Sequence, residues 1–121
     1  MEEIVDQLRK IINFKKSTEE GDVVLIVMDN PQSLLYAVVT GIERDESRRD
    51  EWWHLSLQIL AVPPQKVVWT LRVSQFTGEE IFTMGGDKRF IQAVDFSIQK
   101  SGPVDGPGGD KEVKPKLRVV K

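Results

Sequence analysis

The apolar residues near the N-terminus recur at intervals of three and four positions, with charged residues between them. This spacing gathers their side chains into one stripe of an amphipathic α-helix. Acidic residues lie near the start of the segment and basic residues near its end, an order that complements the helix dipole. The pattern predicts a helix over residues 2–14. Its stripe consists of Ile4, Val5, Leu8, Ile11 and Ile12.

From residue 22 onward the pattern changes to that of β-strands. The first run, residues 23–28, is apolar throughout and rich in β-branched residues, as is typical of a central strand buried on both faces. The clearest alternation lies at residues 52–61, where Trp53, Leu55, Leu57, Ile59 and Ala61 form one apolar face. The predicted strands cover residues 23–28, 34–43, 52–61, 67–74, 81–84 and 89–96.

Short turns join these strands, and no helical crossover follows residue 22. Because parallel neighbours need long crossovers, we expect an antiparallel meander over residues 22–98, curled or closed into a small barrel. The expected class is mainly β (α+β), with five or six strands and an N-terminal amphipathic helix. This architecture resembles the small SH3-like barrels, and Gly21-Asp22-Val23-Val24 resembles their entry into the first strand. The resemblance carries over no functional residue.

Residues 1–100 are expected to form a single globular domain. Glycine and proline dominate the start of residues 101–121, which predicts a flexible linker that ends in a basic tail. In the tail, Leu117, Val119 and Val120 lie among basic residues. This segment could add as an edge strand to a partner, or it could be a solvated terminus without a role.

Composition narrows the functional classes. The 121 residues include no cysteine, which excludes disulfides, thiol nucleophiles and thiolate metal sites. The N-terminus is acidic, unlike a signal peptide, and the longest apolar run spans six residues, so we expect a cytoplasmic protein without a membrane segment. The net charge is −2, and residues 1–100 carry −4, from 12 basic and 16 acidic side chains. This balance argues against a broad phosphate-binding face.

Candidate catalytic groups are few. His54 is the single histidine, which excludes a metal site with two histidine ligands. As a general base it would need a nearby hydroxyl and an orienting carboxylate. Ser56 shares its face only because of the strand period, so we interpret His54 as a surface polar residue. Paired acids fall in predicted turns, and Gly85-Gly86 lacks the spacing of a Walker loop. We therefore predict no enzyme, no metal site and no cofactor.

Nucleic-acid binding is an alternative. Trp52 and Tyr36 could stack bases on a small barrel. Acidic residues that flank Arg48 and Arg49 would neutralise them, which weakens this hypothesis because counterion release requires a surplus of cations. The basic residues predicted outside the core are Arg44, Arg48, Arg49, Lys66, Arg72, Lys88 and Arg89.

Outward apolar residues favour a protein partner. Trp52, Leu60 and Val68 fall on the faces assigned to solvent, as does His54. They form either a seat for the N-terminal helix or an exposed patch for a partner. We therefore predict a non-catalytic protein–protein interaction module whose partner is another protein or a second copy of the chain. A nucleic-acid-binding barrel is the alternative, and an enzyme with a loop-assembled site ranks third.

Overall fold

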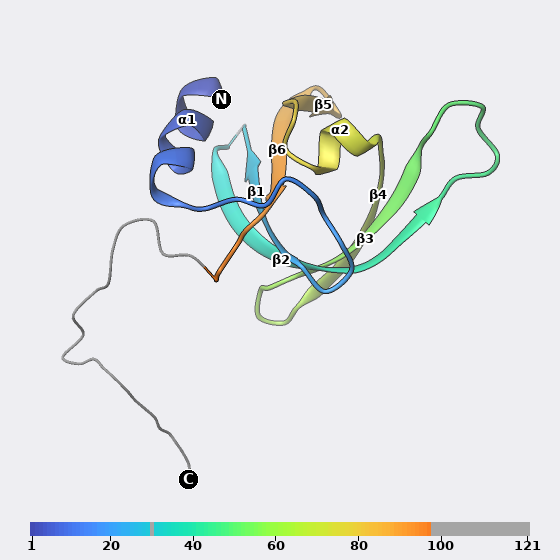
Figure 1. The fold of residues 1–121 in the computed structure, drawn as a ribbon, viewed down its shortest axis with the longest axis horizontal. Helices are drawn as coiled ribbons and strands as arrows, with labels where there is room; N and C mark the ends of the chain where they lie inside the picture. Colours follow the sequence, from blue (N-terminus) through green and yellow to red (C-terminus); the bar gives the residue numbers. More distant parts are fainter. Residues whose placement is uncertain (30, 98–121) are drawn as a thin grey trace, which may run out of the picture.

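A computed structural model gives the fold and describes residues 1–29 and 31–97. Helix α1 (Glu2–Ile11) comes first and is followed by six strands and a short second helix. The strands form one antiparallel sheet that curls into a half-barrel (Figure 1). The mainly β class predicted from the sequence is confirmed. The elements after α1 are β1 (Val23–Met28), β2 (Ser33–Arg44), β3 (Trp53–Ile59), β4 (Gln65–Leu71), α2 (Val73–Phe76), β5 (Phe82–Met84) and β6 (Asp87–Ala93).

The order of strands across the sheet is β4-β3-β2-β1-β6-β5. The first four strands form a meander, but the β5–β6 hairpin pairs with β1 and not with β4. Gly85 and Gly86 make this hairpin tight, with φ of +64° and +90°, values that glycine adopts without strain. Because the hairpin attaches to β1, the two edges of the sheet are β4 and β5.

The central strand β1 is buried on both faces, as its continuous apolar run predicted. Val24 and Ile26 face the inside of the curl, where they belong to a core that includes Phe76 of α2. Leu25 and Val27 face the opposite side and belong to a second core with Val5 of α1. In Figure 1, α2 lies inside the curl and α1 outside it.

Helix α1 does not use the seat considered in the sequence analysis, and that hypothesis is wrong. It packs over β1 and β6, where Phe90 and Val94 join Leu25 and Val27 beneath it. The Arg9 guanidinium lies over the Phe90 ring, 5.4 Å from its centroid, and donates to the carbonyl oxygen of Gly78 over 2.8 Å. Val5 is thereby buried and Ile4, Leu8 and Ile12 are partly buried, without Leu60 or Val68, which stay exposed, while Ile11 at the end of the stripe is also exposed.

Several boundaries differ from the prediction. The fourth strand was expected to continue to residue 74, but Val73 begins the one-turn helix α2. The backbone N–H of Arg72 donates to Gln75 Oε1 over 2.9 Å, which caps this turn locally. Helix α1 ends at Ile11 and not at residue 14, because Phe14 instead forms a β-bridge with Val94.

Replacing Phe90 with alanine is expected to lower the free energy of unfolding by about 3–5 kcal/mol, because a cavity would open between α1 and the sheet. The ring is buried and packs edge-to-face on Phe14. Urea denaturation of the purified variants measures the change. Phe96→Ala is the matched control, since that side chain is 69% exposed, and should change stability by less than about 0.5 kcal/mol. Equal effects of the two substitutions would contradict the proposed docking of α1.

Candidate interaction surface

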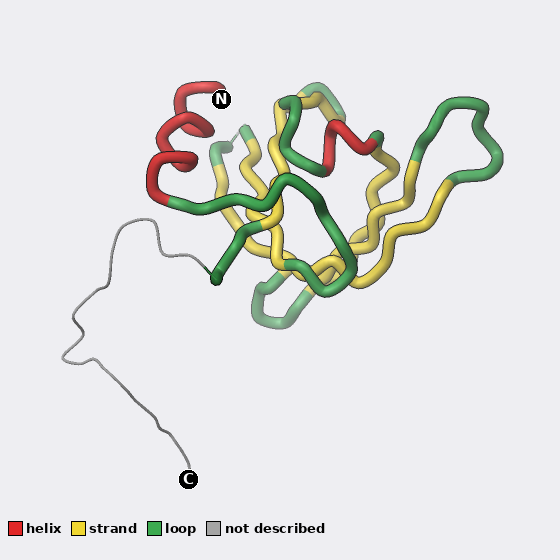
Figure 2. Tube along the Cα trace, viewed as in Figure 1, coloured by secondary structure: helices red, strands yellow, loops and turns green. Residues whose placement is uncertain are grey.

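Helix α1 covers the convex face of β1 and β6, and no other helix among residues 1–29 and 31–97 covers that of β2, β3 and β4. Figure 2 shows the long helix at one end of the curled sheet, away from β3 and β4. Side chains on this face come from the even-numbered residues of β3 and β4, because successive residues of a strand point to opposite sides. Their odd-numbered neighbours Leu55, Leu57 and Leu71 are buried in the inner core.

Three apolar residues at one end of this face form a continuous group, which we call the convex patch: Leu34, Tyr36 and Leu60. Their side chains are 48%, 41% and 54% exposed. Tyr36 and Leu60 are cross-strand neighbours, since the Leu60 N–H donates to the Tyr36 carbonyl oxygen over 3.0 Å. Leu34 lies on the same face of β2, because it precedes Tyr36 by two residues. The arrangement brings apolar side chains of two strands together in solvent.

Val68 is also exposed, at 52%, but it lies apart from the convex patch. It pairs with Ser56 on β3, and the polar pair Gln58 and Lys66 lies between it and Leu60. The structure thus places the predicted residues Leu60 and Val68 on the same outer face without bringing them into one group. Leu34 was missed because residues 34–39 are apolar at every position, so no alternation shows which of their side chains face outward.

His54 lies on the convex face between a hydroxyl and a carboxylate. Its Nδ1 is 3.0 Å from Thr70 Oγ1, and its Nε2 is 3.5 Å from Asp45 Oδ2. The sequence analysis considered only Ser56 as the hydroxyl partner. The register of β3 and β4 places Thr70 directly opposite His54, and the β2–β3 loop returns Asp45 to it. Cross-strand pairing was the signal that would have found Thr70, whereas Asp45 reaches His54 through the closure of the loop.

The carboxylate of Asp45 binds other residues of the β2–β3 loop. Its Oδ1 accepts from the N–H and hydroxyl of Ser47 over 3.0 and 2.6 Å, and its Oδ2 accepts from Arg48 Nε over 3.1 Å. The hydrogen bonds from Ser47 lower the pKa of this carboxyl, with smaller contributions from His54 and Arg48. The carboxylate therefore holds the β2–β3 loop closed, and His54 is one of its anchors.

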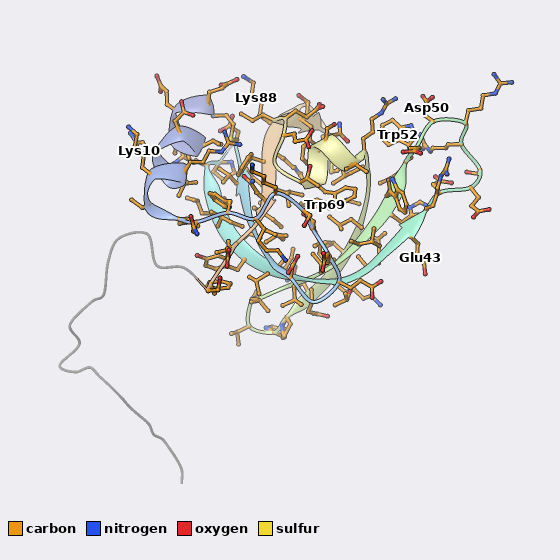
Figure 3. All side chains as sticks on the ribbon, viewed as in Figure 1. Lys10, Glu43, Asp50, Trp52, Trp69 and Lys88 are labelled. Carbon is orange, nitrogen blue, oxygen red and sulfur yellow. The ribbon has the colours of Figure 1, made fainter. Side chains whose placement is uncertain are left out.

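Trp52 does not join the exposed apolar residues. It lies in the loop before β3 and is half-buried, with the Arg48 and Arg72 guanidinium groups 5.2 and 4.8 Å from its ring centroid. Arg72 also donates to Asp50 Oδ2 over 3.1 Å. Figure 3 shows Trp52 and Asp50 close together at this loop. Whether Trp52 contacts a partner stays a prediction, and in the structure the two guanidinium groups cover part of its ring.

Two concave regions lie away from His54. One of about 310 Å³ separates α1 from the turn before β5, and it combines apolar residues such as Val5 and Phe90 with the carboxylates of Glu2 and Asp6. A second, of about 250 Å³ and mostly apolar, lies beside α2. Its lining residues are Ser17, Thr18, Ile42, Trp53, Val73, Phe76 and Thr77. Neither hollow is lined by His54, and a third, polar hollow of about 250 Å³ beside its partner Asp45 is lined by Arg44, Glu46 and Arg48.

Residues 1–29 and 31–97 contain no group of three or more histidine, aspartate or glutamate side chains that could hold a metal ion. Within the same residues, neither helix has the length and apolar character needed to cross a membrane. The predicted tail contacts Leu117, Val119 and Val120 lie outside the described residues.

Comparison with known proteins found no matching family model, no matching curated protein and no matching solved structure. The inference about function therefore depends on the geometry of the chain itself.

Replacing Asp45 with asparagine is expected to destabilise the protein near neutral pH but not in strong acid. Because the pKa of Asp45 in the folded chain lies below the ordinary 3.8, its stabilising effect is present above that value. The effect is lost as the pH falls through the folded-state pKa. Urea unfolding between about pH 2.5 and 6 should show the gap between wild type and Asp45→Asn closing in acid. Glu46→Gln, in the same loop, is the control, and a gap independent of pH would contradict the anchoring role of Asp45.

Proposed function

We propose that the chain is a non-catalytic protein-interaction module whose contact surface is the convex patch. The observation that supports this proposal is the exposure of Leu34, Tyr36 and Leu60 on a half of the sheet that α1 leaves uncovered. Apolar groups gathered on an otherwise polar surface are typical of sites that bind another protein. The partner would cover the three side chains and remove them from water, which provides the driving force for association.

The composition of the patch suits such a contact. Tyrosine combines a large apolar ring with a polar hydroxyl, and it is enriched at the centres of interfaces, where single residues contribute most. Gln58 and Lys66 lie beside the patch on the same face and would form its polar rim. The partner is expected to present a flat or shallow apolar surface, because the patch lies on a sheet and not in a groove.

The nucleic-acid alternative has less support from the geometry. Arg48 is paired with Asp45, and Arg72 is paired with Asp50. A ligand phosphate would have to compete with these carboxylates for each guanidinium group. Binding to phosphates also weakens steeply as salt rises, whereas an apolar contact depends little on salt, so the two functions predict different salt responses.

Substituting Leu60 with lysine is expected to abolish capture of a protein partner, because the charge would have to be buried in the contact. Tagged wild-type and variant chains are incubated with a lysate of the source organism, with and without nuclease, and the captured proteins are compared. The wild type should retain a discrete protein that resists nuclease, and Leu60→Lys should reduce its recovery by about tenfold or more, equivalent to a loss of ~1.4 kcal/mol.

Ile11→Lys is the matched control, since Ile11 is 60% exposed but belongs to α1. This variant should retain the partner at the wild-type level, and circular dichroism should show both variants folded. Equal loss with the two lysine variants would show that the contact is not specific to the convex patch. Loss of the captured proteins after nuclease treatment would contradict the proposal and support nucleic-acid binding.

A further inference from the structure

Strand β4 forms one edge of the sheet and is much longer than the other edge strand. It spans seven residues, Gln65–Leu71, whereas β5 spans three, Phe82–Met84. Among the residues that the structure describes, the strand partner of β4 is β3, and no other strand lies beside it. Residues 65–70 are exposed or half-buried, so this edge is accessible over most of its length.

The hydrogen bonds of β3 show which groups of β4 point outward. The N–H of Leu60 donates to Tyr36, and the carbonyl of Trp52 accepts from Asp45. The backbone N–H and carbonyl groups of the even-numbered residues of β3 therefore point toward β2. The backbone groups of the odd-numbered residues between them point toward β4, because the backbone groups of a strand alternate between its two neighbours. On β4 the partners of these odd-numbered residues are themselves odd-numbered. The N–H and carbonyl groups of Lys66, Val68 and Thr70 therefore point away from the sheet.

Among the described residues, the outward backbone groups of these three positions have no partner, and such a row is a template for another strand. Natural edge strands are protected by short length, proline, bulges or charges, and β4 has none of the first three within its bounds. Its one charged residue, Lys66, lies near its start, and the middle position is the exposed, β-branched Val68.

We propose that a second copy of the chain pairs with this edge, antiparallel to it and about a twofold axis at Val68. In that register Val68 lies opposite Val68 of the second copy, and Lys66 lies opposite Thr70 in both directions. All three outward residues of each copy would then exchange backbone hydrogen bonds. The two half-barrel sheets become one continuous sheet, with the valine side chains in contact on its convex face.

Charge and the position of a proline favour the axis at Val68 over the neighbouring axes at Trp69 and Val67. An axis at Trp69 would place Lys66 opposite Arg72, where it would compete for the Asp50 carboxylate that already pairs with Arg72, and like charges directly opposite each other are destabilising. An axis at Val67 would place Thr70 opposite Pro64, which has no N–H to donate. It would also bring the two Lys66 side chains onto one diagonal of the sheet. With the axis at Val68, the lysines lie four residues apart along the edge.

The edge strand is complementary to a second copy of itself. In this register each Lys66 lies beside a Thr70 and the two Val68 side chains meet, so the cations that the second copy brings have no like charge directly opposite. This proposal is independent of the convex patch, because it uses backbone groups of another strand.

Single-cysteine variants test the register, because the chain contains no cysteine. Val68→Cys should form a covalent dimer on mild oxidation, since the Cα atoms of a directly opposed, hydrogen-bonded pair lie about 5.5 Å apart, within disulfide range. A mixture of Lys66→Cys and Thr70→Cys should form a covalent heterodimer, while Lys66→Cys alone should not. Leu60→Cys is the exposed control. Crosslinking of Val68→Cys no faster than that of Leu60→Cys would overturn the proposal.

Sedimentation equilibrium of the full chain provides the second readout, since a dimer has twice the 13.8 kDa mass of the chain. Val68→Lys should weaken the dimer by about tenfold or more, because it places two cations opposite each other. Leu60→Lys should leave the dimer intact while removing the partner of the convex patch. A dimer lost with Leu60→Lys but kept with Val68→Lys would overturn the edge pairing and assign self-association to the patch. A chain that stays monomeric at every concentration would also overturn it.

Discussion

The burial of β1 on both faces is the constraint on which the rest of the structure depends. A strand with apolar side chains on both sides needs two separate cores, one on each face of the sheet. The inner core is supplied by the curl of the sheet and by α2, and the outer core by α1. Because the chain has one long helix among its described residues, the outer core can extend over only part of the convex face.

This unequal coverage connects the fold to the proposed functions. Helix α1 covers β1 and β6, so among the described residues the outer surfaces of β2, β3 and β4 are exposed or half-buried. The residues exposed there include apolar side chains that neither core uses, such as Tyr36 and Val68. The strand order adds a second consequence, since the β5–β6 hairpin joins β1 and leaves β4 as an open edge. Both proposed contacts therefore follow from where the N-terminal helix and the last hairpin attach.

The sequence predicts local features of this fold well and the contacts between distant segments poorly. Alternation identified the buried Leu55 and Leu57, and the continuous apolar run identified β1, because the pattern of apolar residues in a strand predicts which of its faces are buried. The helix α2 was missed because Val73 continues the alternation of β4, while a single capped turn decides the conformation. The docking of α1 and the pairing of β6 with β1 depend on tertiary packing that no local pattern encodes.

The same distinction applies to the candidate site. Leu60 and Val68 were predicted to face outward, since a strand period determines this directly, and both are exposed. The partners of His54 were missed because Thr70 and Asp45 reach it only through the register of β4 and the closure of a loop. The neighbours of Trp52 were missed for a related reason, because the arginines that cover its ring come from two segments that the sequence does not place together.

The central claim is that the convex face of β2, β3 and β4 is uncovered while that of β1 is covered. A soluble paramagnetic agent added to the methyl-labelled full chain at low concentration tests this most directly. The account predicts strong broadening of the Leu34, Leu60 and Val68 methyl signals, with those of Leu25 and Val27 protected beneath α1. Protection of the Leu34 and Leu60 methyls to the level of Leu25 would contradict it, because a covered face cannot be the free surface on which the proposed interaction depends.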